Sequence, residues 1–135
     1  MSEIADTLKQ HHVALRGALE ILKSKKGDDL VSELKRLQPA VTALLTSEET
    51  LFAEILRACA QRNDTGSANI ARIFEGNLKV MAAGIRGFFD QLAVLAKDPR
   101  QLEQRARTMI DVLNSQMETE GRAVIPLHTK LTKAA

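Results

Sequence analysis

Apolar residues recur along most of the chain at alternating intervals of three and four positions, which places them on one face of an α-helix. Four segments carry this pattern, at about residues 4–24, 29–62, 67–97 and 99–130. The third has the most regular apolar seam, made of Phe74, Leu78, Met81, Ile85, Phe88, Leu92 and Leu95. Helices that each present one apolar face bury those faces together, so the pattern predicts an all-α fold, an up-down-up-down four-helix bundle.

Residues typical of helix ends separate these segments. Gly27 suits the position after the first helix, and Asp28 is available to cap the second. Residues 63–67 form the clearest loop, with Thr65 or Ser67 available to cap the third helix. The short first turn predicts that the first two helices run antiparallel.

One proline of this chain is expected to start a helix, and the other two are expected to disturb the helices that contain them. Asp98 followed by Pro99 is a strong start signal for the fourth helix. Pro39 lies inside the second segment, where its missing N–H should bend or break the helix. Gly121 and Pro126 should loosen the fourth helix near Glu120.

Three glycines, Gly76, Gly84 and Gly87, lie inside the third segment although each weakens a helix. We expect a neighbouring helix to pack closely at these positions. A hinge is the alternative reading.

The fourth segment contains a conflict between pattern and chemistry. Its inward series reads Leu102, Ala106, Met109, Leu113, Gln116, Glu120, Ala123 and Leu127. Gln116 and Glu120 therefore occupy positions at which apolar residues are expected. A carboxylate buried there must be paired, hydrogen-bonded, protonated or bound to a metal, because burying it bare is very unfavourable.

Other polar residues also fall on inward positions. His12 completes the apolar series of the first helix, and His11 fits a neighbouring stripe, so the pattern leaves open which ring lies deeper. Glu48 takes an inward position in the second helix, and Asn77 flanks the seam of the third. The pattern predicts a mid-bundle cluster of His12, Glu48, Gln116 and Glu120, with His11 and Asn77 as supporting polar residues. Carboxylates and imidazoles on facing helices are the groups with which bundles hold metal ions.

The chain of 135 residues fits one domain, residues 1–135. Its composition also argues against several classes of partner. Its 19 Lys and Arg residues and 17 Asp and Glu residues are interleaved, which argues against a nucleic-acid partner. No apolar run approaches a membrane span, and the single cysteine, Cys59, suits a reducing compartment. We expect a cytoplasmic protein that binds neither nucleic acid nor membrane.

Three stretches carry a family resemblance. They are His11-His12-Val13-Ala14-Leu15-Arg16, then Ser47-Glu48-Glu49-Thr50-Leu51-Phe52-Ala53, then Gln116-Met117-Glu118-Thr119-Glu120 followed by Ile125-Pro126. In order, they resemble the Asp-His-x-x-Ile-Arg opening, the Glu-Glu-x-x-Leu-Phe-Pro stretch and the His-x-x-x-Glu motif with downstream Phe-Pro of the hemerythrin-like (HHE cation-binding) family. The resemblance covers nearly the whole chain and implies a four-helix bundle with His12 at a ligand position.

The chain departs from this family at most of its ligand positions. The resemblance expects a histidine where Gln116 stands, and the third helix contains no histidine at all. The second motif aligns in two registers. With Glu48 as the retained carboxylate the lost histidine falls at Leu44, and with Ser47 it falls at Ala43.

The family's ligands hold a diiron centre that binds or senses oxygen, and this chain retains only His12, Glu48 and Glu120 as candidate metal ligands. One imidazole and two carboxylates cannot hold two irons in that way. His128 lies too near the end of the fourth helix to replace Gln116. We therefore expect no cofactor, with one divalent metal ion, such as iron, as the alternative.

These observations predict a divergent bundle that has lost the diiron site and acts as a non-catalytic binding or regulatory module. Its partner would be another protein or a second copy of the chain. An enzyme is not expected, because the sequence has no nucleophile–base arrangement, phosphate loop or Cys/His cluster. The alternative function is metal-dependent sensing of oxygen or redox state. Histidine phosphotransfer is disfavoured, since His11 and His12 lie on or beside the apolar stripe.

Overall fold

A computed structural model describes residues 3–132, and this part of the chain consists of helices and short connections without any strand. The elements are α1 (Glu3–Leu22), α2 (Gly27–Arg62), α3 (Thr65–Asp90), α4 (Leu92–Leu95), α5 (Pro99–Thr119), the π-helical η1 (Glu120–Val124) and α6 (Ile125–Thr132). The all-α prediction is confirmed. Residues 1–2 and 133–135 of the predicted domain lie outside the described residues.

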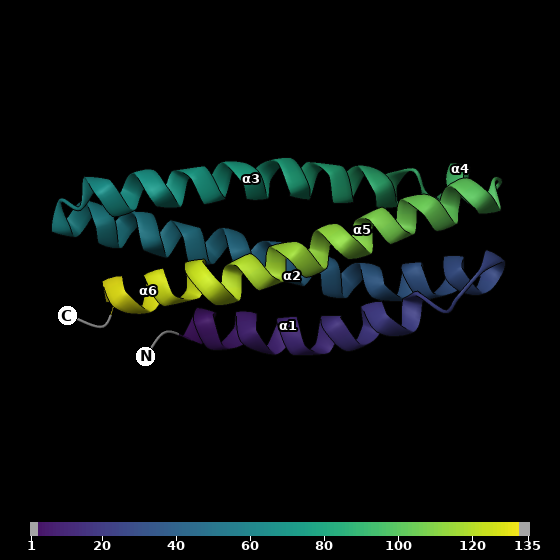
Figure 1. Ribbon diagram of the computed structural model, residues 1–135, viewed down its shortest axis with the longest axis horizontal. Coiled ribbons are helices and arrows are strands. Elements are labelled where there is room, and N and C mark those ends of the chain that lie inside the picture. The colour runs from purple at the N-terminus through teal and green to yellow at the C-terminus, as the bar shows by residue number, and fades with distance from the viewer. Residues whose placement is uncertain (1–2, 133–135) are drawn as a thin grey trace.

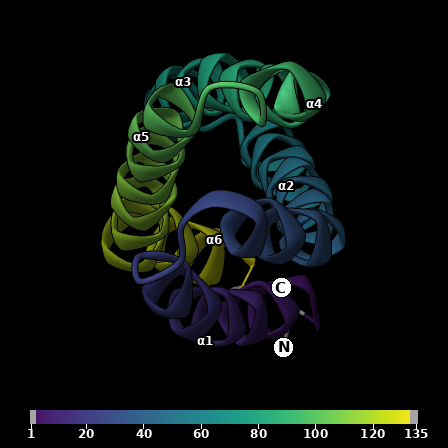
Figure 2. The ribbon, with the colours of Figure 1, turned by 90° about the vertical axis from the view of Figure 1, so that its right-hand side faces the viewer.

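The long helices lie lengthwise beside one another (Figure 1). α5, η1 and α6 follow each other without a break and form one continuous helical stretch. Seen from the end, α1 and α3 lie on opposite sides, with α2 and α5 between them on the two remaining sides (Figure 2). α2 packs against α1, α3 and α6, and α5 packs against α3 and α1.

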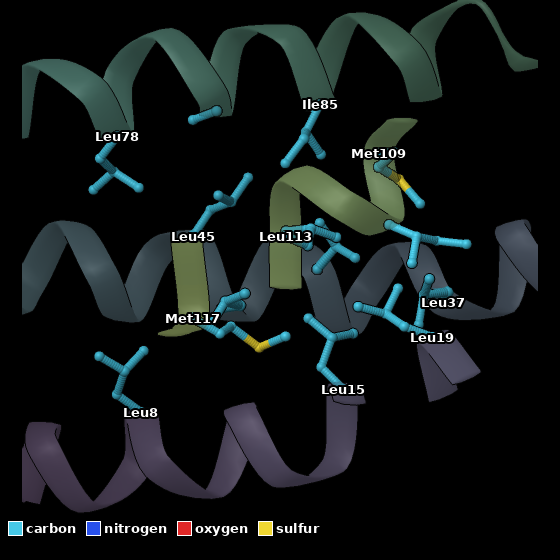
Figure 3. Packing of buried hydrophobic residues seen from close by; sticks show 14 of the residues in the cluster. Leu8, Leu15, Leu19, Leu37, Leu45, Leu78, Ile85, Met109, Leu113 and Met117 are labelled. Atoms are coloured by element: carbon cyan, nitrogen blue, oxygen red, sulfur yellow. The ribbon is translucent and has the colours of Figure 1, made fainter. Parts of the chain in front are cut away.

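The predicted apolar stripes meet in a common core (Figure 3). Leucine dominates it, with methionine and isoleucine filling the spaces between helices. The residues labelled in Figure 3 are all buried: Leu8, Leu15, Leu19, Leu37, Leu45, Leu78, Ile85, Met109, Leu113 and Met117. Cys59 is buried as well, as a small core residue. The spacing of apolar residues therefore sets which face of each helix turns inward.

Two predicted helix caps are wrong, and one is confirmed. Asp28 does not cap α2, because the helix begins one residue earlier, at Gly27, which has a left-handed φ of 55°. Asp64 caps α3 in place of Thr65 or Ser67: its carboxylate accepts a bond of 2.9 Å from the N–H of Ser67. Asp98 caps α5 as expected and accepts from the N–H of Gln101 at 3.2 Å.

Two expectations about helix continuity are answered by the structure. α2 runs through Pro39 as one helix, so Pro39 does not break it, and a bend at Pro39 stays a prediction. The proline lies on the exposed face, where water can hydrate the carbonyl that it leaves unpaired. The third helix ends at Asp90 and not near Lys97, since Gln91 leaves helical geometry and the short α4 follows.

The expectation of close packing at Gly76, Gly84 and Gly87 is wrong within this chain. A Cβ atom added at any of the three would meet no atom within 4 Å. Gly76 and Gly84 are exposed on α3. No neighbouring helix in residues 3–132 therefore requires these glycines.

The open surroundings of these glycines give a testable prediction. Gly76→Ala and Gly84→Ala should each stabilise the monomer by roughly 0.5–1 kcal/mol, because alanine restricts the unfolded chain and has the higher helix propensity. Gly27→Ala should instead destabilise by about 1 kcal/mol, since it forces a Cβ atom into left-handed backbone. Urea unfolding followed by circular dichroism at low protein concentration measures all three. A loss of stability in both α3 variants would contradict the prediction.

Candidate polar site in the core

Glu120 accepts hydrogen bonds at both ends of its carboxylate. His12 Nε2 on α1 lies 2.8 Å from Oε1, and Gln116 Nε2, one turn earlier in α5, donates to Oε2 at 3.0 Å. His12 and Glu120 are both buried, and Gln116 is half-buried. The structure thus brings together the histidine and the two fourth-helix residues that the sequence singled out.

Glu48 contributes a second carboxyl group from α2. It is completely buried, and neither of its oxygens meets a partner at hydrogen-bonding geometry within residues 3–132. Burial, followed by contact with Glu120 and the negative charge of that residue, raises the pKa of Glu48 from 4.5 to about 11. Glu48 is therefore protonated at neutral pH.

The proton on Glu48 determines what the cluster can do. A neutral Glu48 adds no second charge beside Glu120, which accepts from His12 and Gln116. Two ionised carboxylates side by side in a core would repel each other without solvent screening. The arrangement is a hydrogen-bonded network that keeps its buried charge low.

The other predicted residues fall into different positions. His11 is half-buried beside the cluster, and its Nδ1 lies 3.3 Å from the hydroxyl of Ser47. The deeper ring is therefore that of His12. Asn77 is exposed on α3, so its expected inward position is not found.

The structure also distinguishes the two registers of the α2 motif. Leu44 and Glu48 are completely buried, whereas Ala43 is exposed. Ser47 is buried but faces His11. The inward pair is thus Leu44 with Glu48.

Helical geometry changes at Glu120 itself. The N–H of Ile125 bonds to the carbonyl of Glu120, five residues back, and η1 forms a single wide turn. Pro126 accounts for this turn, because it lacks an N–H and its ring clashes with the carbonyl four residues back in a regular α-helix. The prediction that Gly121 and Pro126 loosen the helix near Glu120 is confirmed.

The wide turn shifts the inward face of the helix by one residue. The sequence pattern placed Ala123 and Leu127 in the inward series, but both are only half-buried. Val124 and His128, one position later, are completely buried instead. A π turn accommodates one extra residue, which explains a shift of this size.

The shift creates a partly buried polar contact that the sequence pattern did not predict. His128 Nε2 lies 2.9 Å from Glu54 Oε1, and His128 Nδ1 has no partner within the described residues. The signal that could have revealed this contact is Pro126, because the wide turn that it imposes rotates His128 inward.

The donor set of the cluster is a poor fit to a metal centre as it stands. Among residues 3–132, no three His, Cys, Asp or Glu side chains are grouped so that they could hold an ion. The 2.8 Å between His12 Nε2 and Glu120 Oε1 suits a hydrogen bond, and it would also suit two adjacent ligands about 2.0–2.2 Å from one ion. Glu48 does not complete such a set.

Comparison of the chain with known protein families, with characterised proteins and with solved structures gives no match. The hemerythrin-like resemblance therefore remains a proposal. Within the described residues, no helix has the length and apolar character needed to cross a membrane.

The raised pKa of Glu48 predicts a specific pH dependence. Below the unfolded-state pKa of 4.5 both states hold the proton, and above it only the folded state does until about pH 11. The folded state then binds more protons, so the free energy of unfolding should fall as pH rises, by about 1.4 kcal/mol per pH unit. Glu48→Gln, which resembles the protonated acid, should lack this term.

Urea unfolding of both proteins between about pH 5 and pH 8 tests this linkage. The stability of Glu48→Gln relative to the wild type should increase steadily across that range. Glu49→Gln is the matched control, because Glu49 is exposed and pairs with Arg86 at 2.9 Å. Parallel profiles for the wild type and Glu48→Gln would show that Glu48 is ionised in the folded protein.

Proposed function

We propose that the protein is a divergent hemerythrin-like four-helix bundle that has lost the diiron site and acts as a non-catalytic binding or regulatory module. The observation that carries this proposal is that both oxygens of Glu120 accept hydrogen bonds from neighbouring side chains, one from His12 and one from Gln116. A carboxylate held by hydrogen bonds from two side chains has a structural role that needs no metal ion.

The surroundings of the cluster support the loss of a diiron site. His12 is the only imidazole bonded to either core carboxyl group among the described residues. Leu44 lies one turn before Glu48, and the inward residues of α3 include only apolar side chains such as Leu78, Ala82 and Ile85. Two irons need several imidazole and carboxylate ligands from facing helices.

Because side chains fill the interior of the bundle, a partner would bind to its outer surface. The core is packed with leucine, and the polar network is closed around Glu120. A module of this kind acts through the shape and charge of its exposed helix faces. The single buried cysteine, Cys59, fits a reducing compartment such as the cytoplasm.

Metal analysis of protein purified from iron-supplemented cells tests the proposal directly. We expect iron well below one atom per chain and no absorption of an oxo-bridged pair in the near ultraviolet. About two irons per chain, the load of an intact diiron centre, would refute the loss of the site.

Restoring the missing imidazoles gives a sharper form of this test. Leu44→His combined with Gln116→His places two more imidazoles beside Glu48 and Glu120, and bound iron should rise above the wild-type level. Ala43→His combined with Gln116→His is the matched control, because Ala43 points to solvent. Equal iron in the two double variants, both checked for helical circular dichroism, would remove support for the hemerythrin-like arrangement.

The alternative function is a metalloprotein with one divalent ion, used to sense oxygen or redox state. Two observations favour it. His12 Nε2 and Glu120 Oε1 are spaced like adjacent ligands, and both oxygens of the buried Glu48 lack a hydrogen bond within residues 3–132. A small movement of Glu48 would complete a three-residue set.

This alternative predicts that added Fe(II), Mn(II) or Zn(II) raises the melting temperature, because an ion that binds only the folded state stabilises it by mass action. His12→Ala should abolish the rise. His11→Ala is the control and should keep it, since His11 contacts Ser47 and not Glu120. No shift of the wild type at about millimolar metal would exclude the alternative.

A further inference from the structure

α3 carries an exposed apolar stripe that no other part of the described chain covers. Ile73 and Val80 are 66% and 76% exposed, although both are β-branched apolar residues. The exposed Gly76 and Gly84 and the half-buried Gly87 complete the stripe, and a Cβ atom at each would meet nothing within 4 Å. α3 runs along the edge of the molecule in both views (Figure 1 and Figure 2). We call these five residues the α3 stripe.

The spacing of residues in the α3 stripe is symmetric about its centre. From Ile73 to Gly87 its members are separated by three, four, four and three residues, with Val80 at the centre. A two-fold axis at Val80 would place Ile73 opposite the partner's Gly87. The same axis would place Gly76 opposite the partner's Gly84. Each bulky residue away from the axis thus meets a position without a side chain.

We propose that the protein forms a homodimer in which α3 packs antiparallel against α3 of a second copy, with the two-fold axis at Val80. A two-fold interface uses the same patch on both subunits, so a self-complementary stripe is what it requires. Facing glycines let two helix backbones approach closely and bury Ile73 and Val80. This dimer is independent of the polar site in the core.

Charges beside the stripe fit the same register. By helical spacing, Arg72 and Asp90 lie on the flank of α3 that also carries Arg86, the partner of Glu49 on α2. Neither Arg72 nor Asp90 forms an ion pair within residues 3–132. The two-fold axis brings the same flanks together, so Arg72 comes within about two residues of the partner's Asp90 along the helix, roughly 3 Å. Two such pairs form in each dimer.

The two-fold axis also brings the two copies of Lys79 near each other, because Lys79 is next to Val80 in the sequence. Its Nζ lies 3.7 Å from Glu75 of the same helix. That pair reduces the repulsion between the two copies of Lys79. The palindromic spacing and the Arg72–Asp90 complementarity together favour a second copy over an unrelated protein as the occupant.

Sedimentation velocity of the full chain over a range of concentrations tests the dimer. The wild type should shift from monomer to dimer as concentration rises. Val80→Glu should raise the dimer dissociation constant at least tenfold, because it opposes two carboxylates at the axis. Val13→Glu is the matched control, since Val13 is a valine of similar exposure, 72%, on α1. It should leave dimerisation unchanged.

A charge exchange tests the register itself. Arg72→Asp should raise the dissociation constant by roughly threefold to tenfold, and combining it with Asp90→Arg should restore the wild-type value. A wild type that stays monomeric at about millimolar concentration would overturn the proposal. Equal effects of Val80→Glu and Val13→Glu would overturn it as well, and failure of the exchange to restore binding would exclude this register.

Discussion

Glu48 and Glu120 meet in a core that is mostly apolar, where two ionised carboxylates cannot lie side by side. The proton held by Glu48 removes one charge, and His12 and Gln116 hold the other through hydrogen bonds to Glu120. The hydrogen bonds to Glu120 join α1 to the end of α5, and Glu48 on α2 lies against Glu120. A shift of α1 or of the end of α5 would leave the buried Glu120 carboxylate without its partners, which is strongly destabilising. The network therefore constrains helix register more than it adds to stability.

The wide turn of η1 lies between this network and the contact of His128 with Glu54. Gln116 reaches Glu120 across one regular α-helical turn, and the π geometry begins only at Glu120. Beyond that point Pro126 forces one extra residue into the turn, so that His128 faces α2 and meets Glu54. One proline thus determines where a histidine nearly two turns beyond Glu120 lies. The continuous α5–η1–α6 stretch therefore makes two polar contacts, one at Glu120 and one at His128. The inward face of the helix differs by one residue before and after the wide turn.

Periodicity predicted the long helices and the inward positions of His12, Glu48 and Glu120, because burial follows a constant repeat in a regular helix. It could not predict His128, since counting residues assumes that every turn is the same. It also could not choose between His11 and His12, whose stripes differ by one residue. The cap at Asp64 was missed because residues 63–67 offer several capping side chains, and only the backbone geometry selects among them.

The glycines of α3 show a different limit of sequence reasoning. On the inward face of α3, the small buried residues are alanines such as Ala71 and Ala82, which also favour the helix. Inside a regular helix, glycine is better than alanine only where a Cβ atom has no room. Gly76, Gly84 and Gly87 have that room in the monomer, so together they weaken α3 by about 1.5–3 kcal/mol, and no packing contact within residues 3–132 offsets this loss. That loss is a sizeable part of the stability of a small domain. In the proposed dimer, the antiparallel contact through α3 would remove the room at these positions, and the missing Cβ atoms would let the two backbones pack closely.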